Sequence, residues 1–94
     1  MNIKLSQKQA TIILDETSRY SEVKDRSKEV NLEDLEKIII DFSKIKHIFS
    51  AILNILVYIR KNFDGEITLI KMNDHIFEQL KTFKILSFFE VRRS

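Results

Sequence analysis

Residues 37–50 read KIIIDFSKIKHIFS, and the order of residue types in this stretch decides the fold. The run at 37–41 is rich in β-branched side chains and stops at an aspartate, which predicts a short buried strand. The apolar residues of 51–63 then recur at helical spacing, which predicts a helix over 50–62. The chain therefore passes from a strand into a helix, and Ser50 lies where that helix begins.

The flanking sequence predicts more strands and helices in alternation. Other short apolar runs predict strands at 3–5, 10–14 and 67–70. A polar helix with few apolar positions, Tyr20 among them, separates the second and third strands, and Asn31 and Asp34 begin a brief helical turn. Because strands and helices alternate, we expect helical crossovers between neighbouring strands of one sheet.

The C-terminal half has its own start and stop signals. Asn73 is a good N-cap for a helix that ends near Phe83. Gly65 is expected to adopt a left-handed conformation in the turn before the strand at 67–70. The segment 85–91 is expected to form either a short helical turn or a last strand.

Composition excludes several classes of protein. The 94 residues are sufficient for one domain, 1–94, and the formal net charge of +2 is too small to indicate binding of nucleic acid. Cysteine is absent, so no disulfide or thiolate metal site is expected. The N-terminus has no signal region, and no apolar run is long enough to span a membrane. We therefore expect a cytoplasmic protein that does not insert into membranes.

Few residues indicate catalysis or metal binding. His47 and His75 are the only imidazoles, and neither has a metal-like partner at helical spacing, so we expect no metal and no cofactor. A small hydrolase would need a pocket joining Asp41, His47 and Ser50, and only residue type supports it. Asp41 is expected to accept hydrogen bonds from backbone N–H groups after its strand. We therefore expect that the protein is not an enzyme.

The helix predicted over 50–62 has two different faces. One side is apolar and should lie on the sheet; it carries Ile52, Ile55, Leu56, Ile59 and Phe63. The other side is mostly polar and carries Ser50, Asn54, Tyr58 and Lys61, with Leu53, Val57 and Arg60 between the two sides. This second side predicts a docking surface for a partner protein. Ser50 is either a plain N-cap, contributing about 1 kcal/mol, or a phosphoacceptor.

The motifs in this region resemble those of a known family. The buried strand ends in the step Asp41-Phe42-Ser43, and after the loop the chain reads Phe49-Ser50-Ala51-Ile52-Leu53-Asn54. An apolar helix, a turn with glycine and a strand follow. In this order, residues 38–91 resemble the STAS domain, the fold of anti-sigma factor antagonists and of the cytoplasmic part of sulphate transporters. The resemblance implies an α/β fold, a single STAS-like domain with a mixed sheet of about four or five strands and helices packed mainly on one face.

The resemblance also implies a function. Ser50 falls on the position that receives phosphate, in phosphorylatable members, from a kinase that is also an anti-sigma factor. It therefore implies a bacterial regulator of transcription that acts by partner switching: the unmodified form holds a kinase-like anti-sigma factor, and the phosphorylated form releases it. Around Ser50, the expected partner-binding residues are Phe49, Leu53, Asn54, Val57 and Tyr58.

The phosphorylation motif departs from the family pattern. Phe49 stands where the family has an aspartate, and Ile52 and Asn54 stand where it has glycines. The alternative function is therefore a STAS-like accessory subunit of a transporter or another multiprotein complex, without phosphorylation. A weak homodimer is a further alternative.

Overall fold

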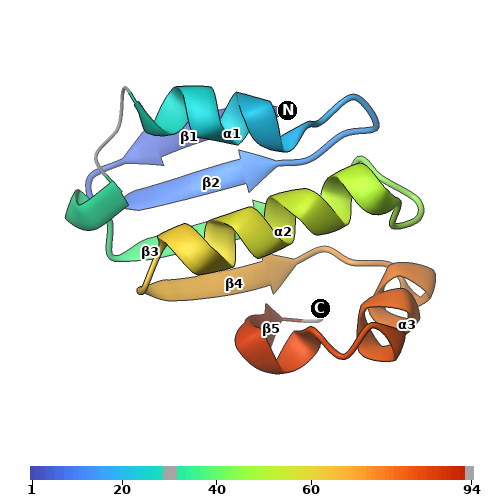
Figure 1. The fold of residues 1–94 in the computed structure, drawn as a ribbon. Helices are drawn as coiled ribbons and strands as arrows, with labels where there is room; N and C mark the ends of the chain where they lie inside the picture. Colours follow the sequence, from blue (N-terminus) through green and yellow to red (C-terminus); the bar gives the residue numbers. More distant parts are fainter. Residues whose placement is uncertain (29–31, 93–94) are drawn as a thin grey trace.

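The structure, a computed structural model, describes residues 1–28 and 32–92 and contains one five-stranded sheet (Figure 1). The strands are β1 (Asn2–Ser6), β2 (Gln9–Ile13), β3 (Lys37–Asp41), β4 (Glu66–Ile70) and β5 (Glu90–Arg92), and they lie side by side in this order. β1 runs antiparallel to β2, whereas all other neighbours are parallel. The expected mixed sheet is thereby confirmed.

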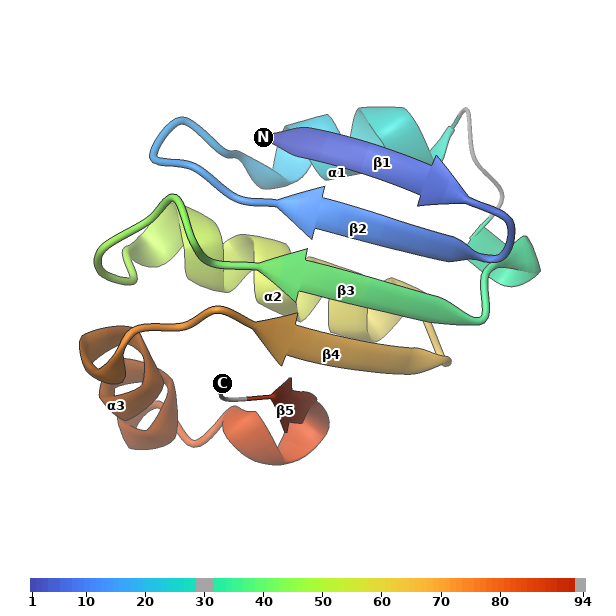
Figure 2. The same cartoon turned by 180° about the vertical axis from the view of Figure 1, so that it is seen from behind.

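The helices lie mainly on one face of this sheet. They are α1 (Tyr20–Ser27), α2 (Ser50–Asn62) and α3 (Asp74–Thr82), with the short 3₁₀ helices η1 (Leu32–Asp34) and η2 (Leu86–Phe88). α1 and α2 cover the same face, and α3 lies beyond the C-terminal end of β4 (Figure 1). Figure 2 shows the opposite face, on which no described helix lies. The expected α/β class and the one-sided arrangement of the helices are confirmed.

Several predicted elements agree with the observed ones. The bounds of β3 and α2 are as expected. Segment 85–91 was expected to form a turn or a strand, and it contributes to both η2 and β5. The turn expected to begin at Asn31 and Asp34 corresponds to η1, although Asn31 itself lies outside the described residues.

The core lies between the covered face of the sheet and α2. The central strands contribute alternate residues, each at most 2% exposed: Ile38, Ile40, Ile67 and Leu69. The helix contributes its predicted apolar side, also at most 2% exposed: Ile52, Ile55, Leu56 and Ile59. Because burial of one such side chain contributes about 1.5–3 kcal/mol, this interface fixes the rotation of α2 and keeps its Ser50 side outward.

Gly65 does not have the expected left-handed conformation, because no described glycine has a positive φ. The restriction there is steric. A Cβ atom on Gly65 would lie 2.5 Å from Cζ of Phe63 and 2.8 Å from the carbonyl oxygen of Glu36. Positive φ angles occur instead at Gln7 (50°), Lys71 (59°) and Lys84 (60°).

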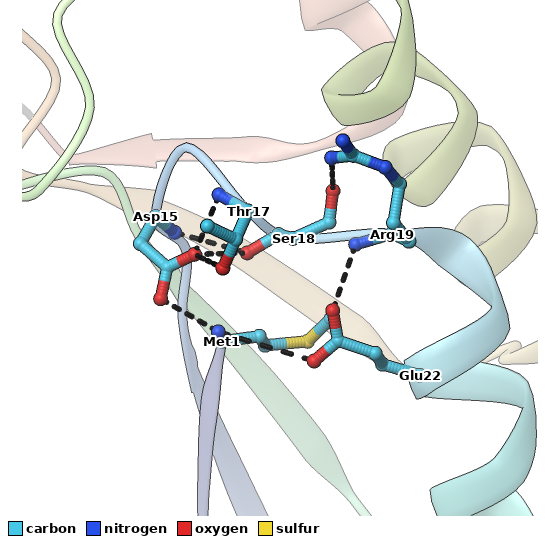
Figure 3. Close-up of polar contacts among 6 residues, drawn as sticks. All are labelled: Met1, Asp15, Thr17, Ser18, Arg19 and Glu22. Carbon is cyan, nitrogen blue, oxygen red and sulfur yellow. Dashed lines mark hydrogen bonds and ion pairs between the residues drawn. The ribbon is translucent and has the colours of Figure 1, made fainter.

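A polar cluster fixes the connection between β2 and α1 (Figure 3). The carboxylate of Asp15 accepts hydrogen bonds from the backbone N–H (2.9 Å) and the hydroxyl (2.7 Å) of Thr17, and lies 2.6 Å from the terminal amine of Met1. The amine and Thr17 hold the pKa of Asp15 below its usual range. Glu22 accepts a hydrogen bond from the backbone N–H of Arg19 (3.1 Å), the N-cap residue of α1, so this N–H group has a partner at the start of the helix. These contacts set where α1 begins.

Candidate protein-interaction site

Asp41, the last residue of β3, holds the start of the loop at 42–49. Its side chain is buried, and Oδ1 accepts a hydrogen bond from the backbone N–H of Ser43 (2.8 Å), while Nζ of Lys71 lies 3.7 Å from Oδ2. Burial alone would raise the pKa of Asp41, but the hydrogen bonds from Ser43 and the charge of Lys71 outweigh it, so the pKa lies below its usual range. The expected structural role of Asp41 is confirmed.

The remainder of this loop is held by α3. Oε1 of Gln79 accepts a hydrogen bond from the backbone N–H of Ile48 (2.8 Å), and Nε2 of Gln79 donates one to the carbonyl oxygen of Ile48 (3.3 Å). Nδ2 of Asn73 donates to the carbonyl oxygen of Lys46 (3.1 Å). The side chains of Ile45 and Ile48 are buried. The loop that leads into α2 is therefore fixed by both its backbone and its side chains.

Ser50 is the first residue of α2, and its side chain is exposed. The N-cap is Phe49, whose backbone is extended (φ −128°, ψ 170°) and whose carbonyl oxygen accepts from the N–H groups of Ile52 (2.9 Å) and Leu53 (3.2 Å). The N-cap interpretation of Ser50 is therefore wrong, since a capping side chain belongs to the non-helical residue before the helix. Within the described residues, no hydrogen bond engages the Ser50 hydroxyl.

The outward side of α2 brings most of the predicted site residues together: Ser50, Leu53, Asn54, Val57 and Tyr58. Ser50, Asn54 and Val57 are exposed, whereas Leu53 and Tyr58 are half-buried against the core. Val57 exposes 44% of its surface. Polar groups and an exposed aliphatic group on one rigid helix are the mixture found on protein-binding surfaces.

Phe49 lies at the N-terminal end of this surface. It is half-buried and packs against the core, and the centroid of its ring lies 5.9 Å from that of His47. Phe49 therefore contributes only part of its ring to the surface beside Ser50.

α1 adds an aromatic neighbour that the sequence did not predict. Tyr20, one of the few apolar positions of the polar helix, is 47% exposed, and its ring centroid lies 6.1 Å from that of Tyr58. The two tyrosines line a shallow hollow together with Asn54, Val57 and Lys61. No local sequence signal identifies this pair, because the two rings come from helices that β3 separates in the chain.

The histidines lie where the sequence placed them. His47 is exposed in the loop before α2, and His75 is exposed in the first turn of α3. Within residues 1–28 and 32–92, no group of three or more potential ligands is arranged to hold a metal ion. In the same residues, no helix has the length and apolar character needed to cross a bilayer.

The sequence of this chain matches no protein-family model and no curated protein.

Proposed function

We propose that this chain is a STAS-like regulatory module of the bacterial cytoplasm that binds a kinase-like anti-sigma factor through the outward side of α2. Phosphorylation of Ser50 is the switch: the unmodified protein holds its partner, and the phosphorylated protein releases it. Phe49, Leu53, Asn54, Val57 and Tyr58 form the contact surface around Ser50.

The exposed hydroxyl of Ser50, which no described group engages, is the observation that carries this proposal. A kinase must reach the hydroxyl oxygen, and a hydroxyl committed to capping would have to break that bond first. The passage from β3 through a fixed loop into α2 also has the order of elements that the STAS resemblance requires. The mixed sheet with helices on one face supports the same class of fold.

The position of Ser50 at the N-terminus of α2 is also suited to the negative charge that phosphorylation adds. A phosphoryl group carries about 1.5 to 2 negative charges near neutral pH. At the start of α2 these charges would lie beside backbone N–H groups that have no partner within the helix, and the helix dipole favours negative charge there. Phosphorylation would therefore leave α2 folded while it changes the electrostatic character of the docking surface.

Phosphorylation in vitro tests the switch. The protein is incubated with ATP and each kinase-like anti-sigma factor of its source bacterium, and intact-mass spectrometry counts the phosphates. One phosphate is expected on the wild type and none on Ser50→Ala. Ser87→Ala is the matched control, since Ser87 is also exposed but lies in η2, and it should accept one phosphate. No phosphate on the wild type, or phosphate retained by Ser50→Ala, contradicts the proposal.

Phe49 favours a second function, a constitutive accessory subunit of a transporter or another multiprotein complex. A half-buried aromatic residue stands at the N-cap, where the resemblance implies an aspartate, and its ring lies against His47. An acidic contact for a kinase is therefore missing beside Ser50. Such a subunit would have kept the docking surface and lost the switch.

Co-purification from native cells distinguishes the two functions. A stable stoichiometric complex that both Ser50→Ala and Ser50→Asp leave intact indicates the accessory subunit. If Ser50→Asp weakens the complex tenfold or more and Ser50→Ala does not, the switch is supported. Val57→Asp should weaken binding under either function, because it puts a charge into the middle of the docking surface.

A further inference from the structure

A second concave surface lies between α2 and the C-terminal segment. We call it the α2–η2 groove: it has a volume of about 230 Å³, and its lining includes Val57, Arg60, Lys61, Ile85, Phe88 and Phe89. The groove shares only Val57 with the expected partner-binding residues around Ser50. It is therefore a different surface, and it does not include Ser50.

The groove exposes large apolar side chains. Phe88 is 58% exposed and Val57 is 44% exposed. Phe88 belongs to η2 and lies outside the core. Its exposure arises because η2 turns the chain at the edge of the sheet, just before β5. Exposed aromatic and aliphatic groups side by side in a groove are characteristic of a binding site for another protein.

Arg60 fixes the two walls of the groove relative to each other. Its Nη1 atom donates a hydrogen bond to the carbonyl oxygen of Phe88 (2.9 Å), and Nη2 donates to the carbonyl oxygens of Phe63 (2.7 Å) and Gly65 (3.0 Å). These bonds connect α2 with η2 and with the turn before β4. The groove is therefore formed before any partner binds, which lowers the entropy cost of binding.

The two charged residues that line the groove, Arg60 and Lys61, are both positive. Next to the lining in the chain, Lys84 precedes Ile85 and the acidic Glu90 follows Phe89. None of these three cations forms an ion pair with a carboxylate among residues 1–28 and 32–92. Arg60 is bound only to carbonyl oxygens, which leaves its charge uncompensated. The complementary ligand therefore carries carboxylates beside apolar groups.

The size of the groove indicates a segment of protein. Pockets that enclose small molecules usually measure roughly 300–1,000 Å³, and this groove is smaller. It has room for one or two large side chains while the remainder of their segment stays outside. An amphipathic helix presents its apolar side chains in this manner, and its acidic residues can lie on the flank.

We propose that the α2–η2 groove binds a short acidic amphipathic segment of a partner protein. One or two large apolar side chains of that segment pack against Val57 and Phe88, and its carboxylates lie beside Arg60 and Lys61. This interaction is a second contact, additional to the one proposed around Ser50.

Peptide display on the full chain tests the proposal. A random 12-residue library is selected on the wild type, with counter-selection on Phe88→Asp. The expected peptides are enriched in Asp or Glu and carry Leu, Phe or Trp at helical spacing. One selected peptide is then synthesised, and fluorescence anisotropy measures its Kd. Lys61→Glu should raise the Kd tenfold or more, whereas Lys4→Glu, which changes an exposed lysine of β1, should leave it unchanged.

Three results would overturn the proposal. The first is a selection without acidic enrichment, and the second is a peptide that binds wild type and Phe88→Ala equally. The third is a dimer in analytical ultracentrifugation that Phe88→Ala dissociates, since the occupant would then be a second copy of the chain. Ser50→Asp should leave the peptide Kd unchanged, so failure of the switch proposed for Ser50 is distinguishable from failure here. Circular dichroism of each variant checks that it is folded.

Discussion

Gly65 is held against its neighbours so closely that a side chain has no space. A Cβ atom there would approach the ring of Phe63 to 2.5 Å and the backbone carbonyl of Glu36 to 2.8 Å. The carbonyl belongs to the residue before β3, so it cannot move without disturbing the sheet.

Gly65→Ala is therefore expected to lower the free energy of unfolding by about 1–3 kcal/mol, the usual cost of overpacking. Chemical denaturation monitored by circular dichroism measures the change. Asp64→Ala alters the exposed neighbouring residue and should change stability by less than about 0.5 kcal/mol. Equal stability of Gly65→Ala and the wild type would show that the turn adapts without cost.

Lys84 has a left-handed backbone just after α3. Its φ is 60°, its N–H bonds to the carbonyl oxygen of Lys81 (3.0 Å), and the N–H of Ile85 reaches the carbonyl oxygen of Leu80 (3.4 Å). This is the usual position of glycine after a helix, because a Cβ atom destabilises the left-handed region by about 1–2 kcal/mol.

Lys84→Gly is expected to raise the free energy of unfolding by about 0.5–1 kcal/mol, since part of the gain is lost to the greater entropy of glycine in the unfolded chain. Lys81→Gly removes the same charge from inside α3 and should lower stability by about 1 kcal/mol. Thermal and urea denaturation of Lys84→Gly and Lys81→Gly would separate the effect of the left-handed backbone on stability from the effect of losing a lysine charge. If both variants lose stability, the left-handed backbone at Lys84 carries no strain.

At the scale of elements, α3 acts as a support for the loop before α2. Gln79 bonds both backbone groups of Ile48, and Asn73, the N-cap of α3, bonds the carbonyl oxygen of Lys46. The position of Ser50 therefore depends on an element that follows it by more than twenty residues in the chain.

Gln79→Ala should lower the free energy of unfolding by about 1–3 kcal/mol, because it leaves partly buried backbone groups of Ile48 without their partners. It should also accelerate amide hydrogen exchange at Ile48. Glu78→Ala, the exposed neighbour on α3, should affect neither quantity. Unchanged exchange at Ile48 in Gln79→Ala would mean that the loop holds its shape without the glutamine.

The elements that were predicted correctly depend on local patterns. β3 follows from its run of β-branched residues, and α2 follows from its helical spacing of apolar residues. The failure at Gly65 has a different cause, because its environment includes the backbone of Glu36, which is distant in the chain. The contacts of Gln79 and the pairing of Tyr20 with Tyr58 were not predictable for the same reason.

For the candidate site, the sequence predicted which residues face outward from α2 but not how the site is supported. Helical spacing alone placed Ser50 and Asn54 on the exposed side, whereas it placed Val57 between the two sides, and the structure shows Val57 exposed. The prediction of Ser50 as the N-cap is wrong because it rested on the preference for Ser at that position. In the structure the backbone becomes helical only after Phe49, so Phe49 is the N-cap.

The stability of the whole molecule should decrease at acid pH. Asp15 and Asp41 both have pKa values below their usual range in the folded protein. As the pH falls, the unfolded chain binds protons at these groups before the folded chain does, which favours unfolding. Their contribution is complete above about pH 5 and is lost progressively below about pH 4.

Urea denaturation between pH 7 and pH 3 measures this loss. Asp41→Asn should be less stable than the wild type at pH 7, since it loses the attraction of Lys71, and should lose less stability on acidification. Asp64→Asn, which changes an exposed aspartate, should keep the wild-type dependence on pH. If the stability of Asp41→Asn depends on pH in the same way as that of the wild type, Asp41 does not contribute to the loss of stability at acid pH.

Because Gln79 secures Ile48, the approach to α2 has its final shape while the protein is still alone. A partner that docks there does not wait for a slow rearrangement, so its association rate constant should lie in the ordinary range of about 10⁵–10⁷ M⁻¹ s⁻¹. Differences in affinity between partners would then arise mainly from how quickly each complex dissociates.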